Sequence, residues 1–146
     1  MIKELNVEIK NVKPALLQAP CCQHVFFVGM HNKPGMKPLD SKTMSGKMID
    51  AVIKELPFEC IKTNLCEVEY LPKDWVEINE HGFLWGQKYQ RRYTDVVVLL
   101  GKWVQNNFFW DDCKIVHISH PASCMGNVNK ENYVKNAIDR ITKAMS

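Results

Sequence analysis

Thr94-Asp95-Val96-Val97-Val98-Leu99-Leu100-Gly101 is the stretch that decides the fold of this 146-residue chain. Five consecutive aliphatic side chains, the first three of them β-branched, predict a strand that a glycine ends. A strand that is apolar on both faces is typical of a parallel sheet that helices cover on both sides. The stretch therefore predicts an α/β protein.

Apolar runs and helical patterns alternate along the rest of the chain. We expect further strands over 24–28, 58–63 and 114–118, and helices over 42–56, 102–109 and 129–145. The segment over 70–86 contains Pro72, Gly82 and several aromatic residues, and is expected to be an irregular surface excursion. These elements predict a three-layer αβα sandwich with a mainly parallel central sheet, in a single domain over residues 1–146.

The composition is that of an ordinary soluble globular protein, with 46% hydrophobic and 24% charged residues. A net charge of +3 is far from the dense basic stripe of an obligate nucleic-acid binder. No apolar run approaches the roughly 20 residues that cross a bilayer, and the first residues lack the apolar stretch of a signal peptide. We therefore expect an intracellular, cytoplasmic monomer with no membrane partner.

The six cysteines include no Cys-x-x-Cys pair. Zinc-ribbon and redox-motif interpretations are therefore poor, and we expect reduced, mostly buried thiols, with no metal and no cofactor. A metal site and a disulfide without function are the alternatives.

Two polar loops follow predicted strands. One is Gly29-Met30-His31-Asn32-Lys33-Pro34-Gly35, and the other is His120-Pro121-Ala122-Ser123. Ligand sites in open parallel sheets lie beyond the carboxyl ends of the strands. We therefore expect Asn32 and His120 to face one crevice. Asn64, which follows the strand expected over 58–63, would bring an amide to the same edge.

Hydrolysis of a base–sugar bond needs few protein groups. The leaving base departs as an anion, so a donor is needed at its developing oxyanion. A second residue must position or activate water, and an amide can recognise the edge of the base. His120, Asn32 and Asn64 are residues of these three types, each at the end of a predicted strand.

The ordered set of motifs resembles the uracil-DNA glycosylase superfamily, most closely the branches with a Gly-Met-Asn-Pro-Gly or Gly-Ile-Asn-Pro-Gly first motif and a His-Pro-Ser last motif. In addition, Ser45-Gly46-Lys47 resembles the Ser/Thr-Gly-basic helix start of that family. The resemblance covers roughly residues 24 to 141, and the order of the motifs carries it. The matching stretches are the loop over 29–35, Thr63-Asn64-Leu65, the strand over 95–101 and the loop over 120–123.

The resemblance implies a monofunctional DNA glycosylase without a nucleophilic lysine. Its substrate would be DNA that contains uracil or another damaged base. His120 would hydrogen-bond to O2 of the departing base. Because His31 and Lys33 are extra residues within the first motif, either His31 or Asn32 would take the catalytic position that governs water.

The resemblance also implies the residues that bind the substrate. Asn64 would recognise the Watson–Crick edge of an extruded base, and Met30 would contact the base. Met125 would enter the base stack as an apolar wedge. The implied contacts to DNA are Lys33, Ser45, Lys47, Ser123 and Met125.

The chain departs from the family in ways that keep other functions open. Residues 36–50 contain no aromatic side chain to stack on the base, which leaves Phe58, Tyr70, Trp75 and Phe83 as candidates. This departure and the altered first motif favour a non-catalytic nucleic-acid or nucleotide binding protein of the same fold. A third possibility is an unrelated α/β hydrolase or nucleotide-binding domain whose motifs match by chance.

Overall fold

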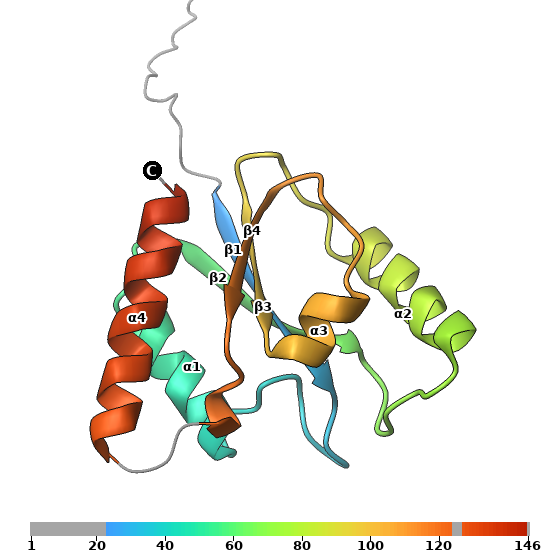
Figure 1. The fold of residues 1–146 in the computed structure, drawn as a ribbon, viewed down its shortest axis with the longest axis horizontal. Helices are drawn as coiled ribbons and strands as arrows, with labels where there is room; N and C mark the ends of the chain where they lie inside the picture. The colour runs from blue at the N-terminus through green and yellow to red at the C-terminus, as the bar shows by residue number, and fades with distance from the viewer. Residues whose placement is uncertain (1–22, 124–126, 146) are drawn as a thin grey trace, which may run out of the picture.

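A computed structural model describes residues 23–123 and 127–145, and its strands form a four-stranded parallel sheet (Figure 1). The strand order is β2-β1-β3-β4. The strands are β1 (His24–His31), β2 (Glu59–Cys66), β3 (Val96–Leu100) and β4 (Lys114–Ile118). The helices are α1 (Met44–Lys54), α2 (Trp75–Lys88), α3 (Lys102–Asn107), the 3-10 helix η1 (Pro121–Ser123) and α4 (Asn127–Met145).

The side chains of the central strands alternate between two apolar cores. In β1, Val25 and Phe27 pack with residues of α1 and α4, whereas Phe26 and Val28 pack with residues of α2 and α3. Figure 1 shows α1 and α4 on one face of the sheet and α2 and α3 on the other. The five residues of β3 alternate in the same way, and all are buried. The uninterrupted apolar run thus belongs to a strand with neighbours on both edges and helices on both faces. The predicted α/β fold with a parallel sheet is confirmed.

A buried carboxylate ties together the beginnings of three strands. Asp95 is 1% exposed, and its side chain accepts the backbone N–H groups of His24 at 2.9 Å and Arg92 at 2.8 Å. Its main-chain oxygen accepts the N–H of Lys114 at 3.1 Å. A buried carboxylate is tolerated when its oxygens accept hydrogen bonds, so Asp95 joins the starts of β1, β3 and β4 without leaving an unsatisfied charge.

Two strands extend further than the sequence predicts. Strand β1 continues to His31, and β2 runs on to Cys66, so that Asn64 lies inside a strand rather than after one. In the parallel register, Gly29 pairs with Asn64 and His31 pairs with Cys66. Pairing between the two strands outweighs the low strand propensity of glycine and asparagine. The sheet itself therefore positions Asn64 and His31.

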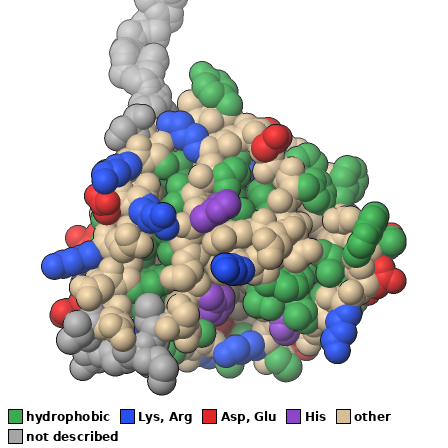
Figure 2. Space-filling view, in the orientation of Figure 1, with side chains coloured by type: hydrophobic (Ala, Val, Ile, Leu, Met, Phe, Trp, Pro, Cys, Tyr) green, Lys and Arg blue, Asp and Glu red, His purple; other side chains and the backbone are tan. Residues whose placement is uncertain are grey.

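The prediction of an irregular excursion over 70–86 is wrong, because most of this segment forms α2. Asp74 caps the helix by accepting the N–H of Val76 at 2.7 Å. The helical pattern is hidden because the outer face also carries large apolar side chains, seen as hydrophobic groups over α2 in Figure 2. The exposed members are Trp75, Val76, Phe83 and Leu84, and the buried ones are Ile78, Gly82, Trp85 and Gly86.

The two glycines of α2 let aromatic rings approach the helix closely. A Cβ atom on Gly86 would lie 2.2 Å from the ring of Trp110, and one on Gly82 would lie 2.8 Å from the ring of Phe109. The indole N–H of Trp110 donates to the main-chain oxygen of Gly82 at 2.8 Å. Gly82 and Gly86, which interrupt the helical pattern in the sequence, are therefore the residues against which the segment after α3 packs.

Arg91 completes this contact. Its guanidinium lies 5.1 Å from the ring centroid of Trp85 and 5.0 Å from that of Trp110. The same group pairs with Asp112 at 2.8 Å, and its side chain is only 4% exposed. Cation–π contacts of a desolvated arginine stabilise such packing. Arg91 therefore holds α2 to the loop before β4.

The C-terminal helix shows a simple amphipathic pattern. Its buried side chains recur every four residues, at Tyr133, Ala137, Ile141 and Met145, and face the sheet and α1. The Tyr133 hydroxyl donates to the main-chain oxygen of Ser119 at 2.7 Å.

No helix within residues 23–123 and 127–145 is both long and apolar enough to span a membrane.

The described cysteines are free thiols. Burial raises the pKa of Cys60, Cys66 and Cys113 to about 11 in each case. These three residues therefore carry little thiolate at neutral pH. Cys21, Cys22 and Cys124 lie outside the described residues.

The packing of α2 makes a first prediction. Gly86→Ala should lower the free energy of unfolding by about 1–2 kcal/mol. Overpacking against Trp110 costs about 2–3 kcal/mol, and the gain in helix propensity offsets only about 1 kcal/mol of it. Chemical denaturation followed by circular dichroism measures the change. Gln87→Ala, on the exposed face of the same helix, should stay within about 0.5 kcal/mol. An equally stable Gly86→Ala variant would contradict the close contact.

Candidate functional site

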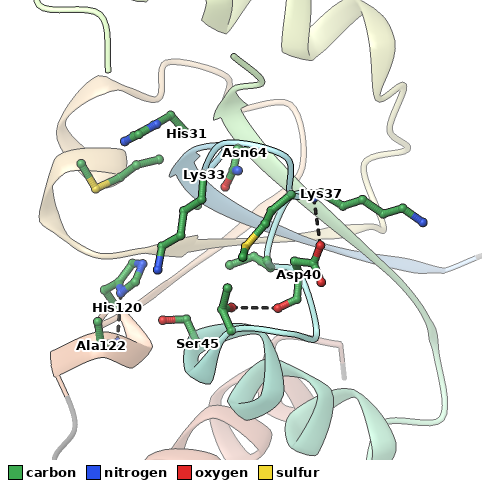
Figure 3. A pocket seen from close by; sticks show the side chains of 13 residues that line it. His31, Lys33, Lys37, Asp40, Ser45, Asn64, His120 and Ala122 are labelled. Carbon is green, nitrogen blue, oxygen red and sulfur yellow. Dashed lines mark hydrogen bonds between the residues drawn. The ribbon is translucent and has the colours of Figure 1, made fainter. Parts of the chain in front are cut away.

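A pocket of about 240 Å³ opens at the carboxyl ends of β1 and β2, beside the loop that follows β4 (Figure 3). Its walls come from β1, the loop after it, the start of α1, β2 and the loop over 120–122. Six of the residues singled out in the sequence line it: Met30, His31, Lys33, Ser45, Asn64 and His120.

The other expected site residues lie elsewhere. The side chain of Asn32 does not line the pocket but accepts a hydrogen bond from Asn64. Lys47 lines a separate groove between α1 and α4. Ser123 is exposed, and its hydroxyl donates to the main-chain oxygen of His120 at 2.7 Å. Met125 lies outside the described residues.

His120 is a hydrogen-bond donor with a defined tautomer. Its Nδ1 accepts the backbone N–H of Ala122 at 3.0 Å, so the single proton of the neutral ring is on Nε2. Burial, and then the positive charge of Lys33, lower the pKa of His120. Figure 3 shows the Lys33 side chain extending toward His120. At neutral pH this ring is therefore an uncharged N–H donor at the pocket.

His31 has the opposite arrangement. Its Nδ1 lies 3.0 Å from the main-chain oxygen of Asn32, and a carbonyl oxygen can only accept. The neutral ring therefore carries its proton on Nδ1, which leaves Nε2 as an acceptor. One pocket thus contains two histidines, one that offers a donor and one that offers an acceptor.

The amide of Asn64 lies across strand β1. The side chain is 3% exposed, and its Nδ2 donates to Oδ1 of Asn32 at 2.8 Å. A Cβ atom on Gly29, the register partner of Asn64, would lie 2.4 Å from Asn64 Oδ1. Only glycine at position 29 leaves room for the amide in this place.

The apolar wall of the pocket comes from Met30, Met36 and Leu39. Leu39 is 9% exposed and has a φ of 50°, in the left-handed region that non-glycine residues seldom adopt. The sequence does not identify Met36 and Leu39 as pocket residues, because the pattern of the loop does not show which side chains fold back over the strand ends.

The pocket has no Phe, Tyr or Trp side chain among its described lining residues. None of the four residues considered for stacking on the base, Phe58, Tyr70, Trp75 and Phe83, lines the pocket. Phe58 packs against the core beneath α1 and α4. Tyr70, Trp75 and Phe83 are each more than half exposed, and two of them lie on α2. Apart from the imidazoles of His31 and His120, only the methionines and Leu39 can therefore contact the face of a bound ring.

The one carboxylate among the described lining residues belongs to Asp40. Its oxygens accept the backbone N–H groups of Lys42 at 2.9 Å and Lys37 at 3.1 Å, and these hydrogen bonds lower its pKa. The main-chain oxygen of Asp40 accepts the hydroxyl of Thr43 at 2.8 Å, and Thr43 caps α1. Asp40 therefore holds the turn that leads into α1.

Comparison with known proteins gives no functional assignment. No protein-family model matches the sequence, and no curated protein matches it. Within the described residues, no cluster of three or more His, Cys, Asp or Glu side chains could hold a metal ion. The hydrogen-bonding groups of the pocket are therefore the basis for inferring function.

The position of Lys33 makes a second prediction. Lys33→Gln should raise the pKa of His120, because it removes a positive charge that disfavours the imidazolium. Burial remains, so the pKa should stay below the ordinary value of 6.5. NMR titration of the imidazole signals measures it. Lys37→Gln changes another lysine of the pocket that does not act on His120, and should leave the titration unchanged.

Proposed function

We propose that this chain is a monofunctional DNA glycosylase, which hydrolyses the bond between deoxyribose and uracil or a related deaminated base. The observation that supports it is the convergence of the His120 donor and the Asn64 amide on one small pocket. The volume of about 240 Å³ is below the roughly 300–1,000 Å³ of sites for drug-sized ligands, and suits a single ring.

The amide of Asn64 matches the edge of uracil. Uracil offers the N3–H group as a donor and O4 as an acceptor, and an amide can accept the first and donate to the second. Nδ2 has two hydrogens, so it can donate to the base while it still donates to Asn32. Met30 and Met36 would lie against the ring, where thioether sulfur makes favourable contacts with aromatic faces.

His120 would stabilise the leaving group. When the bond between C1′ and N1 breaks, its electron pair stays with the base, and negative charge gathers on O2. The Nε2–H of a neutral His120 then donates to an anionic oxygen, a stronger hydrogen bond than one to a neutral carbonyl. The nearby ammonium group of Lys33 adds an attractive field.

We assign to His31 the role of the general base that accepts the proton of the attacking water. A water molecule attacks C1′, and its proton passes to Nε2 of His31, the free acceptor of that ring. The proton then returns to the released base or to solvent. Asn32 is less suited, because its Oδ1 already holds Asn64. Asp40 is occupied by the turn before α1.

The pocket can hold only a base that has left the stack. Extrusion costs a few kcal/mol, least for an unpaired or mismatched base. Lys33, Lys37 and Ser45 lie around the pocket and would contact the phosphates of the strand. Lys47 and Ser123, which do not line the pocket, remain predicted DNA contacts, as does Met125, which lies outside the described residues. Because the proposed substrate is DNA, we expect the protein to act inside the cell.

A second candidate function is binding without cleavage, to a nucleic acid or a nucleotide. The specific observation in its favour is the lack of a Phe, Tyr or Trp ring among the described pocket residues. Base–aromatic stacking contributes about 1–3 kcal/mol per base, so an extruded base would be held less firmly here.

Uracil release tests the proposed function directly. The purified chain should release uracil from a single-stranded or U·G oligonucleotide and leave an abasic site that alkali cleaves. Borohydride should trap no covalent adduct, although Lys33 lies at the pocket, because the proposed reaction forms no Schiff base. Binding to the oligonucleotide without release at high protein concentration would favour the second candidate. A trapped adduct would show that the reaction is not monofunctional.

The donor role of His120 is tested by substitution. His120→Ala should lower the rate of release by about 10²–10³-fold, the usual effect of removing one oxyanion donor. His117→Ala is the matched control, because His117 is exposed on β4 and does not line the pocket, and its rate should be unchanged. If His120→Ala keeps a rate within threefold of the parent protein, His120 does not bind the leaving group.

A further inference from the structure

The side chains of Asn32 and Asn64 form an amide pair at the side of the pocket. Nδ2 of Asn64 donates to Oδ1 of Asn32 at 2.8 Å, and of the two only Asn64 lines the pocket. The backbone N–H of Asn32 donates to the main-chain oxygen of Val68 at 3.0 Å. Residue 32 is therefore anchored by its main chain, whichever side chain it carries.

An asparagine amide can be turned end for end with little change in shape. Half a turn about its terminal bond exchanges Oδ1, which accepts, and Nδ2, which donates. Uracil has a donor at N3 and an acceptor at O4, whereas cytosine has an acceptor at N3 and a donor at N4. One orientation of the Asn64 amide therefore matches uracil, and the opposite orientation matches cytosine.

The surroundings of Asn64 leave the half turn as its main freedom. The amide lies on the backbone of Gly29, where even a Cβ atom would come within 2.4 Å of Oδ1. The side chain is also 3% exposed, so it has little room to swing away. After a half turn of Asn64 alone, its Oδ1 would face Asn32 Oδ1, and two acceptors would meet in place of a hydrogen bond. The opposite orientation of Asn64 therefore requires the Asn32 amide to turn as well.

We infer that Asn32 is a positioning residue that determines base specificity, because it fixes the orientation of the Asn64 amide and thereby selects uracil over cytosine. This inference rests on the proposed function. It assigns Asn32 to recognition through Asn64 and not to the attacking water.

The test compares binding of two substrate analogues that resist hydrolysis. Single-stranded oligonucleotides containing 2′-fluoro-2′-deoxyuridine or 2′-fluoro-2′-deoxycytidine are titrated against the full chain. The parent protein should bind the uracil oligonucleotide more tightly. In Asn32→Leu, of similar size but without an acceptor, the ratio of the two Kd values should fall about fivefold to tenfold.

Two variants serve as controls. In Asn32→Asp both oxygens only accept, so Asn64 keeps its orientation and the ratio of Kd values should be retained, even if the added charge weakens binding of both oligonucleotides. Asn79→Leu makes the same substitution on the exposed surface of α2, and should leave both Kd values unchanged.

The outcomes separate the inference from the proposed function. A parent protein that binds neither oligonucleotide overturns the proposed function, and the inference with it. Equal binding of the two oligonucleotides by the parent protein overturns the inference alone, and so does a parent preference for uracil that persists in Asn32→Leu. If Asn32→Leu does not fold, the inference is tested on the parent protein, by measuring the NMR coupling across the hydrogen bond from Asn64 Nδ2 to the Asn32 side chain. Coupling that persists when the parent protein binds the uracil oligonucleotide supports the inference, and its loss overturns it.

Discussion

The register between β1 and β2 is the constraint on which the site depends. It sets Gly29 opposite Asn64, and a slip of one residue would bring Thr63 or Leu65 to that place and turn the side chains to the other face. A buried chain of hydrogen bonds fixes this register. The Thr63 hydroxyl donates to the main-chain oxygen of Phe27 at 2.8 Å and accepts the indole N–H of Trp85 at 2.8 Å. Helix α2, which carries Trp85, thus helps to align two strands on the sheet it covers.

The sheet also explains why residues distant in the chain meet. All four strands point the same way, so their carboxyl ends share one edge, and the loops after β1 and β4 come together there across β3. Strand β3 ends at Gly101, whose N–H donates to the main-chain oxygen of Ile118 at 2.8 Å. Glycine at position 101 lets the end of β3 approach His120 closely, because a Cβ atom on Gly101 would lie 3.2 Å from the Cβ of His120.

The sequence predicted the elements whose residues agree with their surroundings. The apolar run of β3 was recognisable because burial on both faces demands continuous aliphatic side chains. Strand β4 was recognisable from Ile115, Val116 and Ile118, although it also carries exposed polar residues. Helix α2 was missed because its packing uses glycines on the inside and its outer face carries Phe83 and Leu84. Local pattern cannot reveal such an arrangement, since the rings that fill the glycine surface come from a distant loop.

The candidate site was predictable only in part, for a related reason. His120 and Asn64 stood out because polar residues at strand ends are suited to ligand contact. The tautomers of the two histidines depend on the main-chain atoms of Ala122 and Asn32, which no side-chain motif records. The contact between Asn32 and Asn64 depends on the pairing of β1 with β2, which brings together residues far apart in the chain.

The histidines owe their donor and acceptor character to the peptide backbone rather than to neighbouring side chains. Substitutions in the surrounding wall, at Met36 for instance, can therefore reshape the cavity while the polarity of both imidazoles persists. Evolution could vary the dimensions of this enclosure independently of its proton chemistry. Related chains could accordingly admit rings of differing size with the same pair of histidines.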